Sequence, residues 1–406
     1  MEKLMSLIGV IVLLGTAFLL SENKKKVNWI LVAKGLTIQI VFALIVLKWP
    51  TGQKIFDVLS RGVTKLLGFT SSGTSFLFGS LIDSNQFGVI FALQILPTII
   101  FFSALMSVLY YLGVMQAVVS FLAKIMLKLL GTSGAESLSN TANIFLGQTE
   151  APLLIKPYVN DMTRSELLTI MVGGMATVAG GVMAGYIAMG IDAGHLIAAS
   201  LMAAPASLMI SKIMLPETEE PKTKGKVDMT FEKMDANVID AAARGAAEGL
   251  QLSLNVGAML LAFIALVSLI NYIIAKFGLL IGMSNLSLEW IMGRVFAPFT
   301  FIIGVPFKDI IQAGSLLGQK IVINEFFAFA NLAELVKTGA LDKRTITLLT
   351  YALCGFANIS SIAIQIGGIG GLAPNRRSDI AKLGVRALIG GTLVGLLNAA
   401  IAGILL

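Results

Sequence analysis

Long apolar runs, separated by short polar loops, dominate the chain. An apolar helix of about 20 residues crosses the hydrocarbon core of a bilayer. The alternating pattern of a transmembrane β-barrel is not seen. The sequence therefore predicts an all-α polytopic membrane protein, with continuous spans at Leu4–Leu20, Trp29–Leu47, Phe87–Leu112, His195–Leu215, Leu250–Ile274 and Leu383–Leu406.

Two further segments have patterns that do not fit a span. Gln53–Leu67 places Lys54, Asp57, Arg61 and Lys65 about one helical turn apart. Apolar residues occupy its other face, which is typical of a helix lying in the membrane interface. Pro216–Ala236 is polar and of mixed charge, and we expect an exposed loop that separates two halves of one integrated domain.

Polar residues recur too closely for lipid exposure in Ser133–Pro157 and in Pro306–Ala330. Irregular backbone at membrane depth is tolerated only where protein shields it. Both segments therefore predict re-entrant helical hairpins. Glycines interrupt the span that follows each hairpin, at about Leu167–Gly190 and Thr345–Gly371.

The order hairpin, broken span, continuous span thus occurs twice. Basic residues mark cytoplasmic loops, and they cluster at Lys24–Lys26, at Lys222, Lys224 and Lys226, and at Arg376, Arg377 and Lys382. This topology gives an even number of spans, leaves both termini extracytoplasmic and makes the two hairpins enter from opposite sides. Such an inverted repeat is the layout of many secondary transporters, with the site at the midplane.

The repeat also predicts a division of the chain into four parts. Residues 1–130 hold the N-terminal spans and an interfacial helix of a scaffold, and residues 131–215 form a first transport half. Residues 216–300 supply the polar loop, a scaffold span and a second interfacial helix. Residues 301–406 form the second transport half.

Composition agrees with a membrane protein and narrows the chemistry. Hydrophobic residues make up 56% of the chain and charged residues 13%, about half the charged share of a soluble domain. The net charge of +7 follows from the basic loops, so we do not expect nucleic-acid binding. The single Cys354 and the single His195 offer no disulfide and no cluster of thiolate or imidazole ligands, and no enzyme motif is present.

Two acids stand inside apolar sequence, Glu150 and Glu325. An acid at the centre of a span costs roughly 2.5 to 3.5 kcal/mol on insertion scales, so its default interpretation is functional. Because the two acids have comparable places in the two halves, they predict a binding site at membrane depth. Their concentration at the hairpin tips argues against a channel, which needs a continuous polar pore.

Four strings in the predicted elements resemble the concentrative nucleoside transporter family. They are Gly147–Leu153, the glycine-rich Gly173–Gly181, Asn324-Glu325-Phe326 and Phe356–Ile362. The resemblance implies a homotrimer of protomers with eight spans, two re-entrant hairpins and interfacial helices. It also implies import of nucleosides across the cytoplasmic (inner) membrane by an elevator-like movement, driven by a sodium or proton gradient, with no cofactor besides the coupling ion.

The resemblance further implies roles for individual residues. Gln148, Thr149, Glu150 and Val182 would face the base, and Glu325, Asn358 and Ser361 would hold the ribose hydroxyls. Phe356 and Leu252 would form an apolar wall. Sodium ligands would be the side chains of Asn143 and Thr177, where serine is common in the family, and the carbonyls of Leu146 and Val178.

Other interpretations stay open at this point. Gln148 and Thr149 could satisfy the hairpin backbone, Glu150 could pair with Lys156, and Asn358 and Ser361 could join helices. A proton carried by Glu150 or Glu325 could replace sodium. The substrate could be another polar metabolite.

Overall fold

The computed structural model describes residues 1–225, 235–280, 282–283 and 285–406. These residues are almost entirely helical, as predicted, and their only bridge of β type joins Ser133 to Lys224. The helices of the first half are α1 (Glu2–Leu19), α2 (Trp29–Leu47), α3 (Pro50–Gly68), α4 (Thr70–Phe78), α5 (Ser84–Phe87), α6 (Phe91–Gln94), α7 (Leu96–Tyr111), α8 (Val114–Leu130), α9 (Gly134–Ala142), α10 (Lys156–Val159), α11 (Arg164–Ala176), α12 (Gly180–Ala188) and α13 (Ala193–Met214). Those of the second half are α14 (Val238–Leu280), α15 (Leu288–Ile302), α16 (Ile310–Val322), α17 (Glu325–Lys337), α18 (Lys343–Leu353), α19 (Ile359–Leu372) and α20 (Arg377–Leu405).

The predicted spans are present. Among the described residues, seven helices or helix pairs are long and apolar enough to cross a membrane. The broken pair α18 and α19 supplies the eighth span of the predicted set. The largest boundary difference is α14, which begins twelve residues before the predicted Leu250, because the ion pairs of Arg244 with Asp235 and Glu248 continue the helix beyond its apolar part.

Both hairpins and both broken spans are confirmed, in the same order in each half. In the first half, α9 and the 3-10 helix Ala151–Ile155 flank the hairpin tip, and α11 is separated from α12 at residues 177–179. In the second half, α16 and α17 form the hairpin, and α18 is separated from α19 at residues 354–358. Asparagine side chains cap the N-termini of α17 and α19. Asn324 accepts a hydrogen bond from the Phe327 N–H at 2.8 Å, and Asn358 accepts one from the Ser361 N–H at 2.9 Å.

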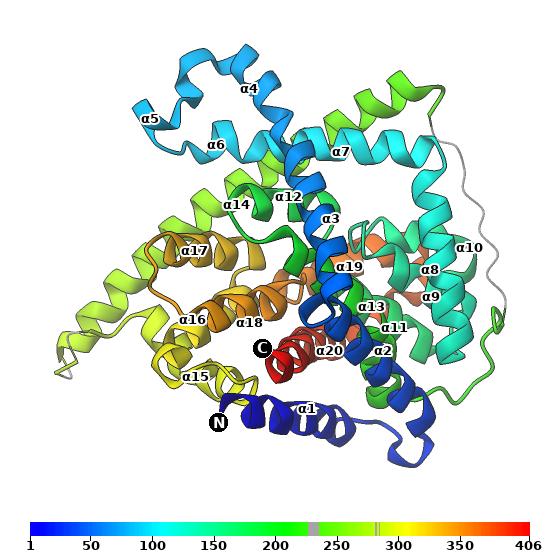
Figure 1. Ribbon diagram of the computed structural model, residues 1–406. Helices are drawn as coiled ribbons and strands as arrows, with labels where there is room; N and C mark the ends of the chain where they lie inside the picture. Colours follow the sequence, from blue (N-terminus) through cyan, green and yellow to red (C-terminus); the bar gives the residue numbers. More distant parts are fainter. Residues whose placement is uncertain (226–234, 281, 284) are drawn as a thin grey trace.

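The helices of the two halves pack into one core. α20 contacts α1, α11, α13, α18 and α19, while the long α14 runs diagonally across the molecule along α7 (Figure 1). The Arg344 guanidinium joins the two ends of the chain, donating to the Ser6 hydroxyl at 3.2 Å and to the Gly403 carbonyl at 2.7 Å. The termini therefore lie at the same end of the helix bundle.

The longest helix that was not predicted from the sequence is α8. α8 lies between the third span and the first hairpin, bounded by Gly113 and Gly131, which both take positive φ angles of 82° and 70°. Its buried side chains Met126 and Leu130 pack against Leu208 of α13. Its short apolar stretch, interrupted by lysines, did not resemble a span.

The predicted loop Pro216–Ala236 is only partly described, because residues 226–234 lie outside the described residues. Its first part folds back onto the first hairpin. The Gly134 N–H donates to the Thr223 carbonyl at 2.9 Å, and the Ala135 N–H donates to the Thr223 hydroxyl at 3.1 Å. This part of the loop is therefore fixed to the start of α9.

Candidate functional site

The breaks in the two discontinuous spans lie against each other. The Phe356 N–H, in the break between α18 and α19, donates to the Thr177 carbonyl, in the break between α11 and α12, at 3.1 Å. Gly355 makes this approach possible: its φ is +153°, and a Cβ there would lie 2.9 Å from the carbonyl oxygens of Met175 and Ala176. Unwound backbone from both halves therefore meets at one place, as predicted for an inverted repeat.

The tip of the first hairpin joins the same place. The Gly180 N–H, at the start of α12, donates to the Phe145 carbonyl at 3.0 Å. Phe145 lies directly before Leu146 and two residues after Asn143, so the hydrogen bond brings the predicted sodium ligands of the hairpin next to those at residues 177 and 178. This hydrogen bond holds the hairpin tip against the break between α11 and α12.

The donor set around the hairpin tip fits a sodium ion. Asn143 is fully buried, and neither its Oδ1 nor its Nδ2 has a hydrogen-bond partner among the described residues. The Thr177 hydroxyl donates to the Gly173 carbonyl at 2.9 Å, which leaves its oxygen lone pairs available. No backbone N–H of the described residues donates to the carbonyls of Leu146 or Val178. Sodium prefers such hard oxygen ligands.

In the second half, Asn358 holds the buried acid. Its Nδ2 donates to Glu325 Oε2 at 2.8 Å, and both side chains are at most 5% exposed. Glu325 lies in the first turn of α17, and Asn358 precedes α19, so the carboxylate faces the start of a helix, where the backbone dipole favours negative charge.

A hydrogen-bonded chain joins the two halves. Gln148 Nε2 donates to Ser361 Oγ at 3.1 Å, and its Oε1 accepts from Gln365 Nε2 at 3.1 Å. Gln365 also donates to the Met171 carbonyl at 2.9 Å. Gln365 had no predicted role, although its place one turn after Ser361 on the same helix could have indicated one.

The remaining predicted base-facing residues lie on the same hairpin and on α12. Thr149 packs against Gly368 of α19, and its hydroxyl donates to Glu150 Oε1 at 3.3 Å. Glu150 is exposed and makes no ion pair with Lys156 among the described residues. The structure therefore lacks the pairing that would give Glu150 a purely structural role.

The predicted wall residues Phe356 and Leu252 come from the break between α18 and α19 and from α14, and the predicted base-facing Val182 comes from α12. Val182 is buried in α12, and Phe356 is half-buried directly after Gly355. Leu252 of α14 is also half-buried and lies near Gly181, the neighbour of Val182. The wall is thus the one part of the predicted site to which α14 contributes.

A buried cation beside the site was missed. Lys320 of α16 is 1% exposed, and its Nζ donates to the Ala352 carbonyl at 2.8 Å, at the end of α18. It precedes Glu325 by five residues, on the other side of the tip of the second hairpin. From the sequence, Lys320 was only one of the polar residues of this hairpin.

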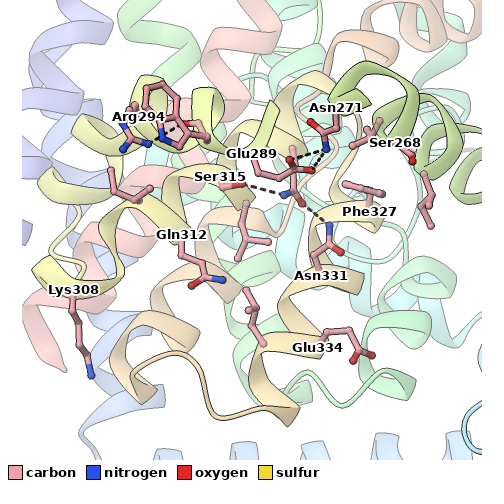
Figure 2. A pocket seen from close by; sticks show the side chains of 17 residues that line it. Ser268, Asn271, Glu289, Arg294, Lys308, Gln312, Ser315, Phe327, Asn331 and Glu334 are labelled. Atoms are coloured by element: carbon pink, nitrogen blue, oxygen red, sulfur yellow. Dashed lines mark hydrogen bonds between the residues drawn. The ribbon is translucent and has the colours of Figure 1, made fainter. Parts of the chain in front are cut away.

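A separate cavity lies away from these residues. It has a volume of about 870 Å³ and lies between α14 and α15 on one side and the second hairpin on the other. Figure 2 shows its polar lining, in which Asn331 donates to Gln319 at 2.7 Å and Asn271 donates to Glu289 at 2.9 Å. None of the predicted substrate or sodium residues lines it.

Sequence comparison decides the family. The profiles described as Na+ dependent nucleoside transporter N-terminus, nucleoside recognition and Na+ dependent nucleoside transporter C-terminus match residues 8–81, 92–193 and 195–403. The chain belongs to the concentrative nucleoside transporter family. The predicted family is confirmed, and the protein is a transporter rather than an enzyme.

Similar proteins cover the whole chain. An uncharacterized transporter, YutK, of Bacillus subtilis is 50% identical over 99% of both chains. The nucleoside permease NupC of Helicobacter pylori is 40% identical over 99% of this chain and 98% of its own. The sodium/nucleoside cotransporter 1 of Mus musculus is 42% identical over 100% of this chain and 64% of its own.

Solved structures of this family have the same fold. An inward-facing, substrate-bound structure of CNTnw has a TM-score of 0.94 at 45% identity, covering 100% of this chain and 98% of that one. An outward-facing structure of a CNTnw variant has a TM-score of 0.96 at 44% identity, with the same coverage. The predicted fold of an elevator-type concentrative nucleoside transporter is therefore confirmed.

Proposed function

We propose that this transporter imports nucleosides across the cytoplasmic membrane by symport with sodium. One observation carries the proposal. Amide, hydroxyl and carboxylate groups from both halves meet near the crossing of the broken spans, and the hairpin that carries Gln148 also carries Asn143, whose Oδ1 has no hydrogen-bond partner among the described residues. A neutral, polar, partly aromatic substrate needs such oriented groups, and it needs no phosphate cradle.

The chemistry of a nucleoside suggests which half of the site binds the ribose and which binds the base. The carboxylate of Glu325 accepts hydrogen bonds from ribose hydroxyls, and such charge-assisted bonds contribute about 1.5 to 3 kcal/mol each. Asn358 and Ser361 stand next to it to complete the ribose contacts. Gln148 offers a donor and an acceptor to the base, Thr149 and Glu150 read its remaining edge, and Val182, Leu252 and Phe356 cover its faces.

Sodium binds at Asn143, Leu146, Thr177 and Val178 and thereby fixes the tip of the first hairpin. Because Gln148 follows Leu146 by two residues, an ordered cation site also orders the base-binding amide. Replacing the usual serine by Thr177 keeps the hydroxyl, so the ion site survives this difference. Coupling then arises because nucleoside and sodium each stabilise the same hairpin conformation.

Transport follows an elevator movement within a homotrimer. The two hairpins, the broken spans and the spans that follow them (residues 131–215 and 301–406) move against a scaffold that includes residues 1–130 and 216–300. α14 supports this proposal, because many of its apolar side chains are exposed in the single chain, including Leu261, Ile264 and Leu269. Other protomers and lipid would cover them. Both termini face the outside, and the loops with Lys24–Lys26 and Lys222–Lys226 face the cytoplasm.

Uptake into proteoliposomes tests the function. We expect radiolabelled uridine or adenosine to accumulate when sodium is present outside, and to stop accumulating when choline replaces sodium. Uptake that persists without sodium and follows an imposed pH gradient would instead support a proton carried by Glu150 or Glu325. Lack of competition by any nucleoside would support a carrier for another polar metabolite.

A further inference from the structure

An open cleft outside the proposed transport site lies between α2 and α8. Its volume is about 590 Å³, and all its lining residues come from these two helices. Those that carry the argument are Trp29, Lys34, Thr37 and Ile38 of α2 and Lys128 and Leu129 of α8. The cleft is therefore mostly apolar, with two lysines in its lining.

Its two lysines are unpaired cations. Within the described part of the chain, neither Lys34 nor Lys128 makes a hydrogen bond or ion pair, and both are exposed. Lys34 lies in a spanning helix, about 7 Å along the axis from Trp29 at 1.5 Å per residue. A lysine at this depth on an outer helix face needs an anion or must extend towards the membrane surface.

The cleft opens at the level of lipid headgroups. Trp29 begins α2 and is 56% exposed, and tryptophan is enriched at membrane interfaces. Its ring contacts Phe18 at the end of α1, with ring centroids 5.4 Å apart, and Lys24 stands 6.0 Å above Phe18. The three lysines Lys24–Lys26 thus adjoin the mouth of the cleft. The cleft therefore lies in the bilayer leaflet in which α1 ends and α2 begins.

The surface below the lysine is suited to acyl chains. Ile30, Lys34, Thr37, Val41 and Leu44 follow each other at three- and four-residue spacing on α2, and all are exposed. They form one face of the helix. The Thr37 hydroxyl is satisfied by its own helix, donating to the Ala33 carbonyl at 2.8 Å, so that face presents no unpaired polar group below Lys34.

We propose that this cleft binds an anionic phospholipid, with the headgroup phosphate between Lys34 and Lys128. Basic pockets between transmembrane helices are suited to such headgroups, and each lysine near an anionic surface contributes about 1 kcal/mol, or about fivefold in affinity. The apolar lining of the cleft and the exposed stripe on α2 favour a lipid over a free phosphate. The lipid would also join α2 to α8, the helix that leads through Gly131 into the first hairpin.

Tryptophan fluorescence gives a direct test that does not depend on transport. In the full-length protein carrying Trp49→Phe and Trp290→Phe, Trp29 is the only tryptophan and lies at the site. Reconstitution with brominated phosphatidylglycerol or brominated phosphatidylcholine then compares the two lipids at the cleft. We expect the anionic lipid to quench Trp29 more strongly, with a relative affinity several-fold above that of the zwitterionic lipid.

A matched pair of variants assigns the preference. Lys34→Gln with Lys128→Gln is expected to lower the affinity for the anionic lipid by about 30-fold at most, at about fivefold per lysine. Lys54→Gln with Lys65→Gln changes the net charge equally, at exposed positions of α3, and is expected to retain the preference.

Four outcomes would overturn the proposal. The first is equal quenching of Trp29 by the two lipids, and the second is a preference for the anionic lipid that survives Lys34→Gln with Lys128→Gln. The third is loss of this preference on adding millimolar glycerol phosphate, and the fourth is no quenching by either lipid. The third would indicate a site for soluble phosphate, and the fourth a cleft covered by another protomer. The first and fourth are read without the lysine variants, so they hold even if those variants fold poorly.

Discussion

Gln148 of the first hairpin donates a hydrogen bond to Ser361 of the second broken span, Nε2 to Oγ at 3.1 Å. The two residues are 213 positions apart and belong to opposite halves of the repeat. The proposed substrate site is therefore shared between the halves, and a change in one half is expected to alter nucleoside binding by the other.

Gln365 is expected to act as a positioning residue for Gln148. Gln365→Leu removes the donor to Gln148 Oε1, and a buried group left unpaired costs about 1 to 3 kcal/mol, so we expect the KM for uridine to rise about tenfold. The concentration dependence of uptake measures this. Gln312→Leu, at an exposed position of α16, should leave the KM unchanged. An unaltered KM in Gln365→Leu would contradict the positioning role.

Nucleoside binding is expected to weaken less when the Asn358 amide is removed than when it is replaced by a carboxylate. Asn358→Ala removes the 2.8 Å bond to Glu325, with an expected loss of about tenfold in nucleoside affinity. Asn358→Asp places a second carboxylate beside the first, and like charges at this separation disfavour the ionised pair. Binding of uridine by calorimetry should rank wild type above Asn358→Ala and Asn358→Asp last. The reverse order of the two variants would show that Asn358 does not act through Glu325.

Substitutions of two asparagines one turn apart on the first hairpin, Asn140 and Asn143, are expected to affect protein stability and sodium binding separately. Asn140 donates to the Glu136 carbonyl at 2.9 Å and accepts from the Ser207 hydroxyl at 2.7 Å, whereas Asn143 has no partner among the described residues. Asn143→Ala should raise the sodium concentration for half-maximal uptake about tenfold or more, since even outer-shell partners are worth about 10–100-fold in metal affinity. Asn140→Ala should lower the unfolding temperature and leave the sodium dependence intact. Identical sodium curves for wild type and Asn143→Ala would remove Asn143 from the ion site.

The crossing of the broken spans makes Gly355 intolerant of a side chain. A Cβ at Gly355 would press on the carbonyls of α11, whereas a Cβ at Gly367 meets no atom within 4 Å. Gly355→Ala is expected to destabilise the protein by about 1 to 3 kcal/mol, the usual cost of overpacking. Thermal unfolding in detergent compares it with Gly367→Ala. Equal unfolding temperatures of Gly355→Ala and Gly367→Ala would show that the close approach of the two breaks does not stabilise the protein.

Lys320 is expected to stabilise both the end of α18 and the charge of Glu325. Lys320→Met keeps much of the side-chain volume but leaves the Ala352 carbonyl unpaired, which costs about 1.5 to 3 kcal/mol for a charged donor. Both the unfolding temperature and uridine uptake should fall. Lys337→Met removes an exposed lysine paired only with Glu334 on its own helix, and surface pairs contribute about 0 to 1 kcal/mol. Comparable effects of the two variants would argue against a role for Lys320.

The sequence allowed most of the fold to be predicted because the bilayer constrains it. Uninterrupted spans such as Trp29–Leu47 were predicted to the residue, since apolar length alone decides them. α8 was missed because its helix is short and interrupted by lysines, and its burial depends on contacts with α2 and α13 that no local pattern reveals. The extension of α14 depends on ion pairs of Arg244 in the same way.

For the candidate site, the sequence allowed individual residues to be predicted but not the contacts between them. Glu325 was a candidate because it is an acid inside apolar sequence, whereas Asn358, Gln148 and Ser361 became candidates through the family resemblance. Their pairing across the halves depends on how the breaks cross, which the sequence does not give. Gln365 and Lys320 were overlooked for the same reason, because each acts through a neighbour that lies far away in the chain.

We propose above that nucleoside and sodium cross the membrane together at one site. Entry of radioactive sodium into proteoliposomes, measured at zero membrane potential with and without unlabelled uridine outside, tests it most directly. We predict that uridine accelerates sodium entry in the wild-type protein and not in Glu325→Gln. Uridine that accumulates while sodium entry stays unchanged would contradict the account.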